Sequence, residues 1–448
     1  MNATAALIRR TPLEGWIARR LAVSGLTLTR EAIAHHQLKA LQKTVVWARN
    51  HSSFYADHLS AVPADIPGSL HDISRLPFTY PEDLVHRGPE LLCVSQDEIS
   101  RVVTLHSSGT TGAPKRLFFT AADQESALDF FANGVTAMAA PGDRMLIALP
   151  SEREGSVGYQ LAKGIARAGI IPIPHGLSVD PIQTLAHLER EHATCIIALP
   201  VQMLALAMND SPLARRALRL LRSIVLCSDH VPESLVRTLR QRSGAEIFEH
   251  YGMTEMGLGG GMDCEAHMGY HLRDADLYFE IINPETGESL PDGETGEIVF
   301  TTLSRTGMPL IRYRTGDLSR FLPGPCACGT VLKRLERVRN RVDGSIRLKA
   351  AGHFNIAMLD EALFAIPGLL DFTATVDQAS PRRLELVAYA HGVAPDLLEV
   401  MVRAAVETIP SLRQSRESGE HQLVVFCTNE SFPVTGAKRR IEVRAPNE

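Results

Sequence analysis

Arg144-Met-Leu-Ile-Ala-Leu149 has the pattern of a buried β-strand, and three similar apolar runs follow it along the chain. They are Ile170-Ile-Pro-Ile-Pro174, Ala193-Thr-Cys-Ile-Ile-Ala-Leu199 and Ser223-Ile-Val-Leu-Cys227. Segments with a helical pattern alternate with these runs, at residues 159–168, 182–190, 213–221 and 233–242. Strands that trade places with helices in this way are typical of an α/β domain whose sheet is largely parallel.

The segments before and after these alternating strands and helices have different sequence patterns. Towards the N-terminus, residues 30–59 show a helical pattern and residues 63–81 are punctuated by Pro and Gly. After Asp276, strand patterns separated by tight turns indicate antiparallel strands, and residues 346–427 mix helices with strands. The sequence therefore predicts an α/β fold with a large N-terminal domain (1–341), which has mixed parallel sheets and a β-rich subdomain. A small, mobile C-terminal α+β domain (342–448) would follow it.

Composition narrows the class of protein. The 448 residues are 45% hydrophobic and 22% charged, and these values are typical of globular proteins. A net charge of −5 offers no electrostatic argument for a nucleic-acid or membrane-surface partner. Seven cysteines behind a start that does not resemble a signal peptide argue against a disulfide framework. We therefore predict a cytoplasmic protein that binds neither nucleic acid nor membrane, and a homodimer is compatible with the sequence.

A loop rich in glycine and hydroxyl groups follows the strand pattern at residues 102–105. It reads His106-Ser-Ser-Gly-Thr-Thr-Gly-Ala-Pro-Lys115. Glycines let the backbone approach a polyphosphate, exposed N–H groups and hydroxyls donate hydrogen bonds, and Lys115 adds a positive charge. The loop is not a P-loop, because the Gly-Lys-Ser/Thr ending is absent. Its composition alone would equally suit a flexible surface loop, but the ordered string of small polar residues favours phosphate binding.

Two further motifs lie downstream in order, Tyr251-Gly-Met-Thr-Glu255 and Arg312-Tyr-Arg-Thr-Gly-Asp317. Together with the phosphate loop, they make the chain resemble the adenylate-forming acyl–CoA ligases, and most of all their phenylacetate–CoA ligase branch. The resemblance extends from about Gln37 to Val443. It implies an enzyme that binds ATP and Mg²⁺ and forms an acyl-adenylate. A lone motif of either kind would more often be an ordinary turn, but three in order reverse that judgement.

The resemblance implies a role for each matching residue. Thr254 and Glu255 would lie beside the α-phosphate, with Glu255 holding Mg²⁺, since a hard cation on carboxylate oxygen neutralises phosphate charge. Tyr251 would lie against the adenine, and Asp317 would accept hydrogen bonds from the ribose hydroxyls. The full set of expected nucleotide contacts is Ser107, Ser108, Gly109, Thr110, Thr111, Gly112, Lys115, Tyr251, Gly252, Asp317 and Arg341.

The C-terminal motifs concern the second domain. Arg341-Val-Asp343 corresponds to the family's hinge, with Asp343 as the pivot. Phe432-Pro-Val-Thr-Gly-Ala-Lys438 matches the tail that carries the adenylation lysine, although a solvated basic tail is the plainer alternative. Arg439 is the alternative to Lys438 as the adenylation residue. The family's thiol-tunnel segment usually has Gly after its basic residue, whereas this chain has Ala350. That departure puts the thioester step, and not the adenylation step, in doubt.

Cysteines and histidines form a candidate zinc site. Cys326-Ala-Cys328 lies in a turn-forming stretch, and Cys264 lies upstream with His267 and His271 nearby. Two thiolates from the turn, with a Cys and a His from another loop, would complete a closed tetrahedral site. Some members of the phenylacetate branch carry a similar pattern, which the resemblance implies is metal-binding. We predict Cys264, His271, Cys326 and Cys328 as ligands, with His267 as the alternative to His271 and unpaired core cysteines as the alternative to a site.

The sequence therefore predicts an ATP-dependent acid–CoA ligase that forms an acyl-adenylate and then a thioester. The branch resemblance and Tyr159 favour an aryl or aryl-acetic acid, although Tyr159 could equally be a packing residue. One alternative keeps the adenylation step but passes the acyl group to a carrier protein or an amine. The other alternative is a nucleotide-binding module without turnover, which degenerate motifs would indicate.

Overall fold

The computed structural model describes residues 8–23, 28–105, 114–178, 180–349, 352–377, 382–429 and 439–444. By its internal contacts the chain divides into two compact units. The first contains residues 1–141, 154–170 and 248–338, and the second contains residues 142–153, 171–247 and 339–448. The boundary that we predict between residues 341 and 342 remains a prediction.

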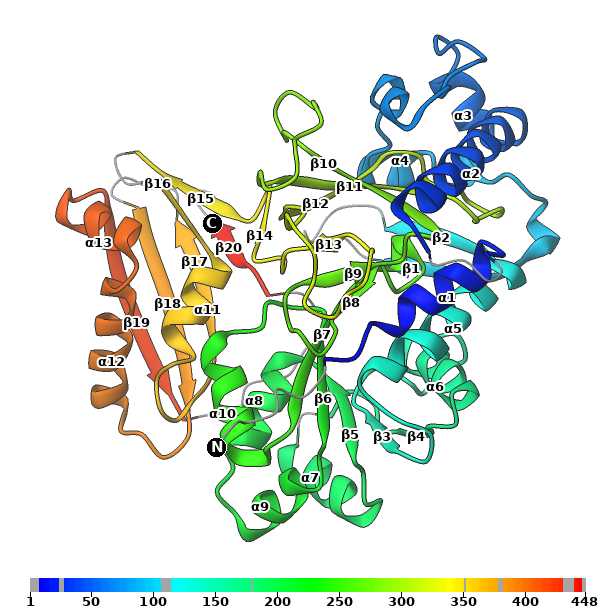
Figure 1. Ribbon diagram of the computed structural model, residues 1–448. Helices are drawn as coiled ribbons and strands as arrows, with labels where there is room; N and C mark the ends of the chain where they lie inside the picture. The colour runs from blue at the N-terminus through cyan, green and yellow to red at the C-terminus, as the bar shows by residue number, and fades with distance from the viewer. Residues whose placement is uncertain are drawn as a thin grey trace. The chain divides into compact units, whose positions relative to one another are not determined.

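Four neighbouring parallel strands of the largest sheet lie in the second unit (Figure 1). Their spatial order is β6 (Ser223–Cys227), β5 (Cys195–Ala198), β3 (Arg144–Ile147) and β4 (Ile171–Pro174). Ile147 of the inner strand β3 pairs with Ile197 on one side and with Pro174 on the other. Every residue of β5 and β6 is buried, as expected for parallel strands covered on both faces. All four strands predicted from the apolar runs are therefore present.

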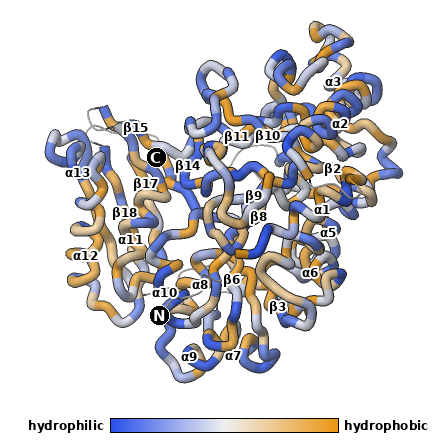
Figure 2. The backbone as a smooth tube through the Cα atoms, in the orientation of Figure 1, coloured by the Kyte–Doolittle hydropathy of each residue, from blue (hydrophilic) through white to orange (hydrophobic). Residues whose placement is uncertain are grey.

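The helices that follow β4 and β5 begin at side-chain caps or prolines. Asp180 caps α7 (Pro181–Arg190), Ser211 caps α9 (Pro212–Arg219), and α10 (Glu233–Ser243) ends at Gly244 in the left-handed conformation. Pro200 occupies the first position of α8 (Pro200–Met208), a helix that the apolar run had not revealed. Hydrophobic residues run along the strands β3 and β6, whereas α9 mixes Leu and Ala with arginines (Figure 2).

The C-terminal part of the second unit is a mixed four-stranded sheet with helices. The strand order is β19 (His421–Thr428), β18 (Arg382–Ala390), β17 (Leu369–Asp377) and β20 (Ile441–Arg444), and only β17 and β18 pair antiparallel. Its helices are α11 (Ile356–Leu363), α12 (Pro395–Glu407) and α13 (Pro410–Glu417). The short strands β14 (Asn340–Arg341), β15 (Ser345–Leu348) and β16 (Gly352–Asn355) precede them. The predicted α+β character is present, with α13 and β20 as additions.

The first unit combines helices with three groups of antiparallel strands. Its helices are α1 (Pro12–Arg20), α2 (Arg30–His51), α3 (Ser53–His58), α4 (Pro81–His86), α5 (Ala121–Gly134) and α6 (Val157–Arg167), with 3₁₀ turns η1 (Leu70–Arg75), η2 (Gly88–Leu91), η3 (Gln96–Glu98), η4 (Val135–Ala137) and η5 (Thr254–Met256). The hairpin is β1 (Ile99–Leu105) with β2 (Lys115–Thr120), and a three-stranded meander joins β10 (Leu277–Ile282), β11 (Gly296–Thr302) and β12 (Tyr313–Ser319). The third group runs in the order β13 (Arg334–Leu335), β9 (Tyr270–Leu272), β8 (Gly261–Met262) and β7 (Glu246–Tyr251).

Each unit has its own hydrophobic core. In the first unit, residues from α2, β2 and the β10–β12 meander pack together, including Leu41, Phe119, Phe300 and Tyr313. In the second, the core includes Leu146, Ile196 and Ile224 as well as Leu359, Leu386 and Val402 of the C-terminal part. Among the described residues, none of the helices is long and apolar enough to cross a membrane.

Candidate functional site

The buried carboxylate of Glu255, in the second predicted motif, contacts one residue from each of the other two motifs. Lys115, the first residue of β2, donates from Nζ to Oε1 of Glu255 over 2.6 Å. Tyr313, the first residue of β12, donates its hydroxyl to the same oxygen over 3.3 Å. The side chain of Glu255 is 3% exposed and that of Lys115 is 19% exposed. An ammonium group, a carboxylate and a phenol thus meet at one point of the first unit.

Glycines fix the turn that carries Glu255. Gly257 ends η5 with φ of +76°, in the left-handed region that glycine adopts without strain. At Gly252 a Cβ atom would lie 2.2 Å from the carbonyl oxygen of Leu258, so no other residue fits without moving the backbone. The glycines of the Tyr-Gly-x-Thr-Glu segment are therefore required by the local fold, whatever further role they have.

A second carboxylate, Asp317, contacts Tyr251, the first residue of the same segment. The hydroxyl of Tyr251 donates to its Oδ2 over 3.0 Å, and Asp317 is only 2% exposed. The rings of Tyr251 and Tyr270 stack with centroids 5.8 Å apart. Burial raises the pKa of Tyr270 well above its usual value, so this phenol stays neutral. A fixed carboxylate beside an aromatic face is suited to a ligand that has hydroxyl groups next to a planar ring.

Period-two alternation along β12 explains why Tyr313 and Asp317 point inward together. Residues 313, 315, 317 and 319 are buried, and those between them are partly exposed. Asp317 is predictable from its motif, whereas the contact of Tyr313 is not part of the motif's expected roles. The alternation of Tyr313, Thr315 and Asp317 was a signal from which this contact could have been found.

The remaining predicted nucleotide contacts fall outside the described residues or in the second unit. The nucleotide contacts outside the described residues are Ser107, Ser108, Gly109, Thr110, Thr111 and Gly112. Ala350 of the thiol-tunnel segment and the predicted adenylation lysine, Lys438, also lie outside the described residues. In the second unit, Arg341 Nε donates to Asp343 Oδ1 over 3.3 Å, and the Asp343 side chain is 80% exposed. Their proposed roles as nucleotide contact and pivot stay predictions.

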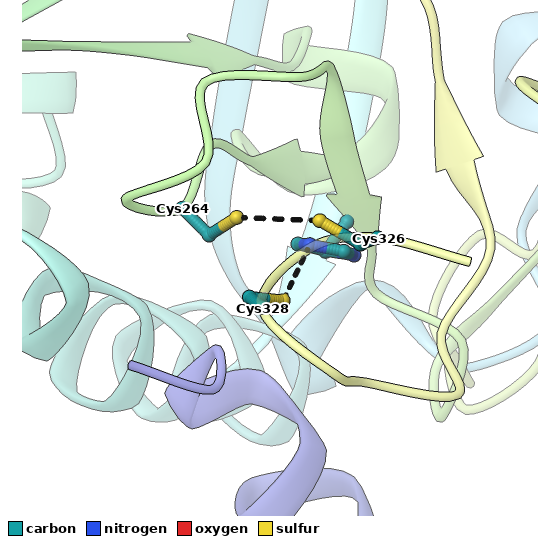
Figure 3. Close-up of side chains that lie close together, drawn as sticks. Cys264, Cys326 and Cys328 are labelled. Carbon is teal, nitrogen blue, oxygen red and sulfur yellow. Dashed lines mark hydrogen bonds between the residues drawn. The ribbon is translucent and has the colours of Figure 1, made fainter. Parts of the chain in front are cut away.

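The predicted zinc ligands come together in the first unit (Figure 3). One ligand atom from each of Cys264, His271, Cys326 and Cys328 lies within 4.8 Å of all the others, and all four residues are buried. Cys264 and Cys326 have their sulfur atoms 3.8 Å apart, and Cys328 Sγ lies 3.4 Å from His271 Nε2. The alternative ligand, His267, instead pairs its Nδ1 with Asp263 over 2.9 Å. The geometry thus brings together the four residues predicted and leaves His267 out.

Hydrogen bonding divides the protons unevenly among these thiols. A hydrogen bond with Cys264 and another with His271 lower the pKa of Cys328, to about 3, against the effect of burial. The pKa of Cys264 is raised, first by its hydrogen bond to Cys328 and then by burial. The lowered pKa of Cys328 favours its thiolate, the form that binds metal ions.

Comparison with known proteins identifies the family. The family model described as AMP-binding enzyme matches residues 26–304. The chain belongs to the AMP-binding enzyme family. Among its relatives in this family, the phenylacetate-coenzyme A ligase of Pseudomonas putida is 31% identical over 356 residues, which cover 75% of this chain and 77% of that protein. The phenylacetate-coenzyme A ligase of Thermus thermophilus is 28% identical over 76% of this chain and 77% of its own length.

Crystal structures of two CoA ligases share the fold. A 2-hydroxyisobutyryl-CoA ligase superposes with a TM-score of 0.77 at 21% identity, covering 92% of this chain and 89% of that one. The anthranilate CoA ligase AuaEII gives a TM-score of 0.54 at 15% identity, over 74% of this chain and 63% of its own. These matches confirm the predicted α/β fold class, and the sequence relatives confirm the predicted superfamily and its phenylacetate–CoA ligase-like branch.

Proposed function

We propose that this enzyme is an ATP-dependent acid–CoA ligase that activates an aryl or aryl-acetic acid as its adenylate. The observation that carries the proposal is the meeting of Lys115, Tyr313 and Glu255 in the same unit as the Tyr251–Asp317 pair. The similarity to the phenylacetate-coenzyme A ligases supports the acid and the thiol acceptor. A small-molecule acid, ATP and CoA are then the partners of the reaction.

The first step joins the acid to AMP. A carboxylate oxygen attacks the α-phosphorus, the bond between the α-phosphorus and its bridging oxygen breaks, and pyrophosphate leaves with the electron pair. Lys115 offsets phosphate charge, and Lys438 offsets the charge that develops between carboxylate and α-phosphate. Tyr251 bounds the adenine and Asp317 accepts hydrogen bonds from the ribose.

Glu255 is the residue that we propose for Mg²⁺ at the α-phosphate, and Thr254 would lie beside the same phosphate. A carboxylate oxygen is the kind of donor that Mg²⁺ prefers, and Glu255 already faces a cation, the ammonium of Lys115. Bound there, the metal ion would neutralise phosphate charge. The contact between Lys115 and Glu255 offsets part of the cost of desolvating both groups before ATP binds, and each can then exchange this partner for the phosphates or the metal ion.

The second step transfers the acyl group to the thiol. The sulfur attacks the acyl carbonyl, the bond from the carbonyl carbon to the phosphate oxygen breaks, AMP leaves with the electron pair, and the thiol proton is released. We propose that rotation at Asp343 removes Lys438 between the steps. Transfer to a carrier protein or an amine is the second candidate, which the alanine at position 350 favours.

Pyrophosphate exchange tests this function. Acid-dependent exchange of label between pyrophosphate and ATP is expected with aryl and aryl-acetic acids, measured over a panel that also contains fatty acids. Release of AMP is expected to require CoA. Exchange with fatty acids but not with any aryl acid would refute the assignment of substrate, and rapid AMP release to an amine or carrier protein but not to CoA would refute the assignment of acceptor.

We also propose that Cys264, His271, Cys326 and Cys328 bind a structural Zn²⁺. Zinc–sulfur bonds of about 2.3 Å in a tetrahedron give sulfur–sulfur edges of about 3.8 Å, and the distance between Cys264 and Cys326 matches this edge. Four buried protein ligands leave no open position, as in structural sites rather than catalytic ones. The ion would tie the segment after Glu255 to the turn after Asp317. A cytoplasmic location and a homodimeric state stay predictions from the sequence.

Removal of one thiolate tests the zinc site. Cys328→Ser is expected to lower bound zinc from about one ion per chain to less than a tenth of that, because serine is a poor zinc ligand. The melting temperature is expected to fall by several degrees. Zinc content is measured by elemental mass spectrometry after dialysis, with Cys427→Ser as a control because Cys427 is a partly exposed cysteine of β19. A wild-type protein that takes up no zinc would contradict the proposal.

A further inference from the structure

Arg439 forms a buried ionic cluster that the proposed mechanism does not use. Its Nε donates to Asp360 Oδ1 over 3.2 Å, its Nη2 lies 3.1 Å from the same oxygen, and its Nη1 donates to Asp371 Oδ1. The side chains of both aspartates are 2% exposed, and that of Arg439 is 14% exposed. All three residues belong to the C-terminal part of the second unit.

Aromatic rings and a carbonyl group complete the surroundings of this guanidinium. Its Cζ atom lies 4.9 Å from the ring centroid of Phe364 and 4.5 Å from that of Phe372. Nη2 also donates to the carbonyl oxygen of Phe372 over 3.2 Å. A planar guanidinium that is held by two carboxylates and two rings has a single orientation, which an ammonium on a flexible stem would not have.

The charges of the cluster do not cancel. Two carboxylates face one cation, and burial raises the pKa of Asp360 to about 6 in spite of the attraction of Arg439. An unpaired buried charge is costly, so loss of Arg439 would leave two desolvated carboxylates without a partner. The cluster therefore fixes Arg439 strongly, and with it the backbone at this position.

The backbone of Arg439 is bound to a segment more than two hundred residues away. Its N–H donates to Asp229 Oδ1 over 3.1 Å. Asp229 follows Ser228, which has φ of +77° in the left-handed region. Next to this contact, His230 Nε2 lies 3.0 Å from Glu361 Oε1, and the N–H of Glu233 donates to Glu361 Oε2 over 3.1 Å. The end of the chain and helix α11 are thus both attached to the loop at residues 228–233.

We propose that Arg439 is a positioning residue for adenylation, which docks the end of the chain on Asp229 and so sets the place of the lysine before it. The inference rests on the proposed function, in which Lys438 offsets charge at the α-phosphate. Consecutive Cα atoms are about 3.8 Å apart, so a fixed residue 439 limits where residue 438 can lie. The Arg439 side chain is fully engaged in the cluster, which leaves it unsuited to act on ATP itself.

Positioning and simple structural support have different kinetic consequences. A residue that only stabilises the fold would lower both half-reactions by the same factor, through the amount of folded enzyme. A residue that places Lys438 would act on the first half-reaction, because Lys438 has left the site before the thiol attacks. A displacement of about 1 Å in a reacting group can cost about 10²-fold in rate.

The experiment compares Arg439→Met, Arg439→Lys and a matched control. Arg444→Met is the control, because Arg444 ends the nearby strand β20, is about half exposed and forms a 3.9 Å ion pair with Glu385 at the surface. Each variant is measured for acid-dependent pyrophosphate exchange, for thioester formation from preformed acyl-adenylate and CoA, and for melting temperature. Rates are expressed per folded enzyme.

For Arg439→Met, kcat for exchange is expected to fall about 10²-fold, with KM for ATP within about threefold and thioester formation within about threefold of wild type. Arg439→Lys keeps the charge but cannot engage both aspartates. Its kcat for exchange is therefore expected to lie between those of Arg439→Met and the wild type. If Arg439→Met does not fold, the test uses Arg439→Lys instead. The quantity compared is again the ratio of the exchange rate to the rate of thioester formation. Equal losses in both half-reactions, or unchanged exchange in folded protein, would overturn the positioning role. Absent exchange in the wild type would instead refute the proposed function.

Discussion

Glu255→Gln is expected to lower acid-dependent pyrophosphate exchange by about 10²–10³-fold, the loss typical when one preorganised group that stabilises transition-state charge is removed. Glutamine has the size of glutamate but provides no negative charge for a cation at the phosphates. Its amide would also present N–H donors to the ammonium of Lys115, which now donates to Glu255 over 2.6 Å. The loss should appear mainly in kcat, and raised Mg²⁺ should restore only part of it.

The variant should still fold, because Lys115 is 19% exposed and its ammonium can reach water once its partner is neutral. Glu280→Gln serves as a control for the removal of a buried carboxylate. Glu280 holds Arg312 through two hydrogen bonds of 2.9 Å and 3.1 Å in the same unit and has no proposed contact with ATP. This control is expected to lose stability, measured by thermal melting, with exchange per folded enzyme within about threefold of wild type. Exchange by Glu255→Gln that matched this control would contradict the assignment of Glu255 to the phosphates.

Short buried strands were easier to predict from the sequence than the buried helix α8. The strands at residues 144–147 and 223–227 were predictable because short apolar runs between helical patterns have few alternatives. Helix α8 was not predicted, because the apolar run continues unbroken from β5 through Pro200 into it. A buried helix and a buried strand have the same composition, so only the proline marked the change.

Residues of the candidate site that form a short pattern in the sequence were easier to predict than residues that only the fold brings together. Cys326-Ala-Cys328 is a local pattern, and the choice of His271 over His267 agreed with the geometry because His271 lies in a strand that points it inward. The Arg439 cluster was not predictable in this way. Its partners lie 68 and 79 positions earlier in the chain, on β17 and α11, and only the folded sheet brings them together.

Asp317→Asn is expected to weaken ATP binding by about 10²-fold, because hydrogen bonds to a charged acceptor contribute about 1.5–3 kcal/mol each. A carboxylate can accept from both ribose hydroxyls and still accept from Tyr251, whose hydroxyl lies 3.0 Å from Oδ2. An asparagine side chain offers one oxygen for these three donors, and its amide group cannot accept. The effect is measured as the dissociation constant of ATP by calorimetry, and as KM in the exchange assay, with kcat changed much less.

Tyr251→Phe separates the contribution of the carboxylate from that of its support. This variant keeps the ring that stacks on Tyr270 and removes only the hydroxyl group. Asp317 then loses one neutral donor, whereas the hydrogen bond that its backbone N–H donates to Thr315 Oγ1 remains. We therefore expect ATP affinity to fall only about tenfold or less, in line with about 1 kcal/mol for a neutral donor. A loss as large as that of Asp317→Asn would mean that Tyr251 orients the carboxylate, and equal affinities for Asp317→Asn and wild type would remove Asp317 from the ribose site.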